Sequence, residues 1–210
     1  MSDEVGAGGS PAWLLGAAAL FLLLLAALVA TSLWRREPPA FPITHRTPQE
    51  AGDSLGRGLV TLDARDRRAW VRFDFSRSAV VESGEPAGWD VAARRHRLIV
   101  NGGQGFAGHG GVIEVTGTPY EAVGEAPDEG YTGSRVTAGG DSVNSVFDGW
   151  YRYGFFSHLL EPKPATYIVR TADGRYAKLR ILSYYCPGAE PGCLTFEYSY
   201  QGAGGTRLAP

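Results

Sequence analysis

The sequence contains few cysteines, little methionine and little net charge. Only two of its 210 residues are cysteine, one is methionine, and the formal net charge is −2. The near balance of charge argues against a basic nucleic-acid-binding surface. Two cysteines cannot supply the four ligands of a cysteine-based zinc site. No nucleophile elbow, Cys–His arrangement or carboxylate pair suited to acid–base work is present, so the sequence predicts no enzyme.

Glycine, proline and aromatic residues are abundant instead. The chain has 29 glycines and 13 prolines, and 11% of its residues are aromatic. This composition favours many short strands joined by turns over a helical bundle. We therefore expect an all-β soluble domain with antiparallel sheets, and about 150 residues are enough for one such domain with its own core.

One uncharged apolar stretch runs from Trp13 to Trp34 and is followed directly by Arg35 and Arg36. As a helix it would be about 33 Å long, enough to cross a hydrocarbon core of about 30 Å. Trp13 and Trp34 suit the two membrane interfaces, with Arg35 and Arg36 just beyond the second. The alternatives are a buried core helix, which would have a polar face, and a cleaved signal peptide, which would have a basic start and a shorter apolar run. We expect a retained transmembrane helix.

The remaining chain divides by composition. Residues 1–12 and 202–210 are Gly-rich and are expected to be flexible tails, and residues 35–57 form a Pro-rich linker of extended backbone. The β-domain is expected over residues 58–201. The aromatic segment 150–160 is expected to pack on the core or line a cleft. Residues 119–144 are expected to form a long irregular surface segment.

Alternating hydrophobicity locates the main strands. Residues 69–75 and 193–200 alternate apolar and polar side chains, which is typical of half-buried strands. Strands at 165–171 and 175–185 flank a turn containing Asp173-Gly174, a strong hairpin signal. Residues 89–100 are ambiguous between helix and strand. Further short strands are expected at 59–63, 79–82 and 112–116.

Cys186 and Cys193 enclose six residues rich in proline and glycine. In an oxidising compartment they could close a small ring worth roughly 2 to 3 kcal/mol in the loop-entropy account. The alternative is a pair of reduced thiols.

Several of these segments resemble a known family. TYIVRTADGRYAKLRILSYY followed by CLTFEYSYQ, with WVRFDF and GWDVAARRHRLIVNGG upstream, resembles the HmuY-like family over residues 59–201. The resemblance implies an exported all-β domain, and in the best-known members a haem gripped between two axial residues, usually histidines. This chain departs from the family in having an apolar helix in place of a lipobox cysteine. Its histidines also do not map onto the family's ligands.

If haem binds, His109 and His158 are the expected ligand pair. His109 lies in a Gly-rich loop and His158 in the aromatic segment, and neutral imidazole is a good iron ligand. The alternative is that His109 is a solvated loop residue and His158 a packing residue. No cofactor is required by the sequence itself, and haem stays an open alternative.

The sequence gives two answers on topology. Acidic residues precede the helix while Arg35 and Arg36 follow it, which by the positive-inside rule would leave the domain in the cytoplasm. The cysteine pair and the resemblance favour the oxidising side. We expect a single-pass inner-membrane protein with a periplasmic β-domain.

Two functions from different classes remain. The first is a non-enzymatic accessory subunit of a multi-subunit membrane complex, photosynthetic or respiratory, with the bilayer and other subunits as partners and no nucleic acid. Small residues four apart in the helix, at Ala12 and Gly16 and at Ala26 and Ala30, would let a partner helix approach closely. The alternative is a membrane-tethered haem-binding protein of the HmuY type.

Overall fold

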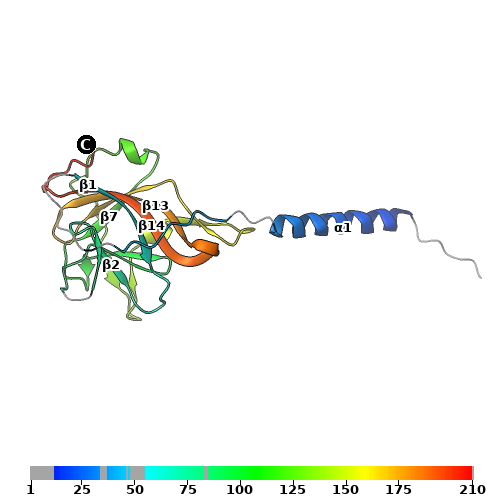
Figure 1. Ribbon diagram of the computed structural model, residues 1–210, viewed down its shortest axis with the longest axis horizontal. Coiled ribbons are helices and arrows are strands. Elements are labelled where there is room, and N and C mark those ends of the chain that lie inside the picture. Colours follow the sequence, from blue (N-terminus) through cyan, green and yellow to red (C-terminus); the bar gives the residue numbers. More distant parts are fainter. Residues whose placement is uncertain (1–11, 34–36, 46, 48–54, 83–84, 210) are drawn as a thin grey trace, which may run out of the picture. The chain divides into compact units, whose positions relative to one another are not determined.

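The computed structural model describes residues 12–33, 37–45, 47, 55–82 and 85–209 (Figure 1). The chain forms two compact units, which we describe separately. The smaller holds the helix and residues 155–158. The larger holds residues 37–154 and 159–209 and contains every strand.

The first unit is built on one helix, α1 (Ala12–Leu33). Its stretch Ala12–Thr31 is long and apolar enough to cross a membrane, and none of it is buried. Trp13 is 71% exposed. The apolar helix predicted from the sequence is therefore present. A helix that is apolar on all sides has no polar face to expose to water. The other three expected interface residues, Trp34, Arg35 and Arg36, lie outside the described residues.

A five-stranded antiparallel sheet forms the main layer of the second unit. Its order is β1 (Leu55–Asp63), β14 (Glu190–Gln201), β13 (Tyr176–Cys186), β12 (Thr166–Arg170) and β7 (Gly111–Val115). The predicted hairpin across Asp173-Gly174 is the β12–β13 pair. Gly174 has φ +86°, a left-handed conformation that glycine adopts without strain.

A smaller four-stranded sheet packs against the first. Its order is β3 (Ala79–Val81), β2 (Val71–Asp74), β4 (Val91–Arg94) and β5 (Arg97–Val100). The ambiguous stretch 89–100 is therefore a hairpin. Arg95, in its two-residue turn, has φ +53°, and that conformation interrupts what would otherwise be a continuous strand or helix.

The core lies between these two sheets and is rich in aromatic rings. Phe73 and Phe75 from the small sheet meet Phe196, Tyr198 and Tyr200 from β14. The rings of Phe73 and Phe196 are 5.7 Å apart and edge to face, and those of Phe75 and Tyr200 are stacked at 6.3 Å. The alternation read in the sequence thus places one face of β2 and one face of β14 in a shared core.

Smaller elements fill the rest of the second unit. They are β6 (Gly103–Gln104), η1 (Tyr120–Ala122), β8 (Ser134–Val136), β9 (Ser142–Val143), η2 (Phe147–Gly149), β10 (Tyr151–Tyr153), β11 (Leu160–Pro162) and η3 (Pro187–Ala189). Strands β6, β8 and β9 form a three-stranded sheet, and β10 and β11 form a separate hairpin. The excursion expected over 119–144 therefore holds short regular pieces.

The segment 37–45 is extended, as its prolines predicted, but it lies on the sheet. Ala40 forms a parallel bridge with Tyr185 on β13. The backbone nitrogen of Thr44 donates to Thr61 on β1 at 3.0 Å, and Thr61 donates back to the Thr44 hydroxyl at 2.9 Å. These described residues of the expected linker are bound to the domain.

The expected C-terminal tail also differs from the prediction. Leu208 is fully buried, and it packs with Val123, Ala126 and Ile168 on the outer face of the large sheet. Its nitrogen donates to Gly124 at 2.7 Å. The burial of Leu208 and the backbone hydrogen bonds of its neighbours together hold this Gly-rich segment on the domain.

Candidate functional site

His109 lies in a tight glycine loop. It forms a bridge with Gly102, its nitrogen donates to Ala172 at 2.9 Å, and its oxygen accepts from Arg170 at 2.9 Å. A Cβ on Gly102 would overlap the backbone of Gly110, so this close approach requires glycine. The loop thus fixes the backbone of His109 while its side chain remains exposed.

His158 belongs to the other unit. It is the last residue of the segment 155–158 and has a left-handed φ of +55°. The same segment contains the exposed Phe155 and Phe156. Since the two histidines are on different units, their pairing around haem stays a prediction.

The other histidines do not supply a second candidate pair. His45 lines a hollow with Asp63 and Val80. His96 packs edge to face against Tyr151, and burial lowers its pKa. Among the described residues, no group of three or more His, Cys, Asp or Glu side chains is arranged to hold a metal ion.

A cavity of about 760 Å³ opens on the outer face of the large sheet, and neither His109 nor His158 lines it. Lys178 projects there and is 3% exposed, and its Nζ donates to the backbone carbonyl oxygens of Tyr120 at 2.9 Å and Val123 at 2.7 Å. Burial lowers the pKa of Lys178 and raises that of the Tyr120 hydroxyl to about 12. Glu197 is held by Arg180. These charged groups hold one another and nearby carbonyls, an arrangement that stabilises the fold.

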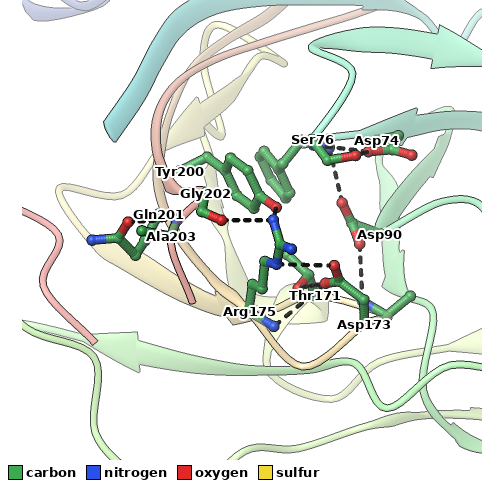
Figure 2. A network of polar contacts seen from close by, with 12 residues as sticks. Asp74, Ser76, Asp90, Thr171, Asp173, Arg175, Tyr200, Gln201, Gly202 and Ala203 are labelled. Atoms are coloured by element: carbon green, nitrogen blue, oxygen red, sulfur yellow. Dashed lines mark hydrogen bonds and ion pairs between the residues drawn. The ribbon is translucent and has the colours of Figure 1, made fainter. Parts of the chain in front are cut away.

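A buried aspartate joins the two sheets at one end of the second unit (Figure 2). Asp90 accepts from the nitrogen of Phe75 at 2.8 Å and from that of Ala172 at 2.9 Å. Its full burial, with the nearby charge of Asp74 as a second cause, raises its pKa to about 7. Asp90 was not predicted from the sequence, because its two partners lie far from it in the chain.

The same network anchors the β12–β13 turn. Arg175 donates to the oxygen of Gly202 at 2.6 Å and to the hydroxyl of Tyr200 at 3.3 Å, and it forms an ion pair with Asp173 at 3.4 Å (Figure 2). Thr171 donates to Asp173 at 2.5 Å. The polar atoms of this network bond to other groups of the protein, so we infer that the network stabilises the fold.

Cys186 and Cys193 form a disulfide across the β13–β14 turn, with Cα atoms 4.9 Å apart. Both cysteines are buried. Gly188 and Gly192 have φ values of +75° and +125° in the enclosed loop. A Cβ on Gly192 would also lie 2.9 Å from the Cα of Arg65, so glycine permits the close packing of the ring.

Comparisons with known proteins agree with this fold. The HmuY protein family model matches residues 66–198. A comparison with curated protein sequences finds no match. An apo HmuY analogue from Tannerella forsythia superposes with a TM-score of 0.56 at 18% identity, over 70% of this chain and 97% of that one.

Two further structures are similar at the level of fold. A protein from Bacteroides vulgatus named as an HmuY-like heme-binding protein has a TM-score of 0.55 at 24% identity, over 69% of this chain and 92% of that one. A protein from Bacteroides fragilis named as a lipoprotein has a TM-score of 0.55 at 19% identity, over 69% and 89% of the two chains. The family model covers more than half of the sequence, and it leads to one conclusion: this chain belongs to the HmuY family.

Proposed function

We propose that this protein is a single-pass membrane protein that presents its HmuY domain as a non-enzymatic interaction subunit. The observation that carries the proposal is a helix with no polar face, followed after a few residues by a segment that is bound to the domain through the bridge between Ala40 and Tyr185. Such a helix is stable in a bilayer or against other apolar helices, and only three residues separate it from the segment that is bound to the domain.

The described groups of the domain support binding over catalysis. Lys178, Glu197 and Asp90 are engaged in contacts within the protein, and a reaction would need such groups directed at a substrate. We place the domain on the exported side, because a disulfide is retained in an oxidising compartment and one structural neighbour is named as a lipoprotein. Other membrane-complex subunits are the proposed partners.

Haem binding is the second candidate, favoured by family membership and by the neighbour named as heme-binding. His109 and His158 are the proposed ligands. They would act as neutral axial imidazoles, provided that residues 155–158 approach the glycine loop.

One preparation separates the two functions. The full chain is purified in mild detergent, its absorption spectrum is recorded, and the same sample is run on a native gel beside the His109→Ala/His158→Ala variant. A colourless chain that migrates with other membrane subunits supports the interaction subunit. A Soret band that is lost in the double variant supports the haem protein. A colourless chain that migrates alone contradicts both.

A further inference from the structure

The β10–β11 hairpin carries an apolar tip. The nitrogen of Gly154 donates to the oxygen of Leu159 at 2.8 Å, which closes the hairpin below residues 155–158. Phe155 and Phe156 at this tip are 76% and 88% exposed, and their rings are 5.4 Å apart. Full burial of one phenylalanine side chain is worth about 1.5–3 kcal/mol, so an exposed pair offers a large gain to an apolar partner.

The base of the hairpin lies where the chain from α1 reaches the domain. Tyr185 on β13 bridges to Ala40, and its hydroxyl accepts from the nitrogen of Leu160 on β11 at 2.7 Å. Leu33 and Glu37 are separated by four residue steps, which span at most about 14 Å. If α1 crosses a bilayer, this end of the domain stays within reach of the lipid surface.

Two arginine-rich turns lie at the same hairpin base. Trp150 donates to the oxygen of His96 at 2.7 Å, and Arg95 donates to the oxygen of Arg65 at 3.1 Å. These turns therefore join β10 to the neighbouring surface. Together they hold six arginines against five nearby carboxylates: Arg65, Arg67, Arg68, Arg94, Arg95 and Arg97 against Asp63, Asp66, Asp141, Asp148 and Glu190.

The excess positive charge suits anionic headgroups, where each basic residue near the surface contributes about 1 kcal/mol. On the hairpin itself Arg152 lies opposite Glu161 of β11, so these two residues balance in charge, and Tyr153 adds an exposed aromatic ring. Aromatic and basic residues around an apolar tip are the composition of a membrane interface.

We propose that the β10–β11 tip is a lipid-docking element, with Phe155 and Phe156 inserted among the headgroups of an anionic leaflet. The inference rests on the proposed membrane tether and adds a second, separate contact with the bilayer. A second contact would also restrict the rotation of the domain at the bilayer surface.

Depth-dependent quenching tests the proposal on the full chain. Phe156→Cys is labelled with the fluorophore NBD and reconstituted into phosphatidylcholine–phosphatidylglycerol vesicles that contain nitroxide lipids. The native cysteines are joined in a disulfide, so the new thiol is the site of labelling. The matched control is Ala203→Cys, an exposed position just after β14, at the end of that strand opposite the disulfide. We expect loss of most emission at residue 156 and unchanged emission at 203. Phe155→Ser should reduce the quenching at 156.

Vesicle flotation and photo-cross-linking distinguish failure of the docking element from failure of the membrane tether. A chain that floats with the vesicles but shows no quenching at 156 overturns the docking element and leaves the tether standing. A chain that does not float overturns the tether and the docking element together. Benzoylphenylalanine in place of Phe156 provides the test in the native membrane, where a cross-link to a protein subunit would overturn a lipid partner.

Discussion

The β12–β13 turn and the β10–β11 hairpin lie near opposite ends of β13, and their tips differ in what they contact. The β12–β13 turn is held by Asp90 and by Arg175, which bind it to the small sheet and to β14 (Figure 2). The β10–β11 hairpin is closed at its base and leaves Phe155 and Phe156 exposed at its tip.

The difference separates stability from contact within one domain. The polar groups of the β12–β13 turn form hydrogen bonds within the protein, so this turn stabilises the fold and presents few free groups to a partner. Where the chain leaves two aromatic rings in solvent, the fold gains nothing from them, and an external apolar surface can. Substitutions at the two ends should therefore affect different measurements.

The largest expected effect is on the core beside the Asp90 network. Phe75→Ala removes a fully buried ring that stacks on Tyr200, and we expect the free energy of unfolding to fall by about 3–5 kcal/mol. Urea denaturation measures this. Phe156→Ala is the matched control, the same change at an exposed site, and a similar loss there would remove the contrast between the two hairpins.

The disulfide sharpens the comparison at the end nearer the exposed tip. Replacement of Cys186 and Cys193 by alanine should lower the free energy of unfolding by about 2–3 kcal/mol, because the unfolded chain is no longer closed into a ring. The expected result is a lower denaturation midpoint with unchanged nitroxide quenching at residue 156. A loss of quenching would show that the tip depends on this brace.

The Asp90 carboxyl gives the other end a pH dependence. Its ordinary pKa of 3.8 rises to about 7 in the folded protein, so the folded state holds the proton over a range where the unfolded state has lost it. The contribution of Asp90 to stability is therefore full below about pH 4 and declines as the pH rises toward 7. Above that pH, both states are ionised and no further change is expected.

Asp90→Asn isolates this effect. The amide keeps one acceptor for two buried N–H groups, so it should cost about 1–3 kcal/mol at low pH. Because asparagine does not titrate, this deficit relative to the unsubstituted protein should shrink as the pH rises through the window. Denaturation curves at several pH values check it, and a constant difference would contradict the assignment.

The smallest expected effect is at the exposed tip. Phe155→Ser/Phe156→Ser should change the free energy of unfolding in detergent by less than about 0.5 kcal/mol, since both rings are already in solvent. A larger loss would show that the tip packs against the protein and would weaken the case for a lipid contact.

The sequence predicted those parts of the fold that depend on neighbours along the chain. The alternation in 193–200 located a strand, and Asp173-Gly174 located a hairpin. Residues 89–100 were ambiguous because the reversal depends on the conformation of a single residue, Arg95.

Features that depend on residues far apart were missed. Asp90 becomes important only when the fold brings Phe75 and Ala172 to it, and composition does not reveal that meeting. Leu208 appeared to belong to a loose tail because its hollow is made by residues about 40 to 85 positions earlier. The aromatic segment 150–160 met its prediction only in part, since Trp150 is buried while Phe155 and Phe156 are exposed.

The docked segment 37–45 also has a mechanical consequence. Tension from the membrane side reaches Ala40 and then Thr44 before it reaches β1, and their bonds to Tyr185 and Thr61 can break one after another. Release of residues 37–45 would lengthen the connection between the helix and the domain by up to about 30 Å. The segment 37–45 would therefore detach before the strands of the large sheet are pulled apart.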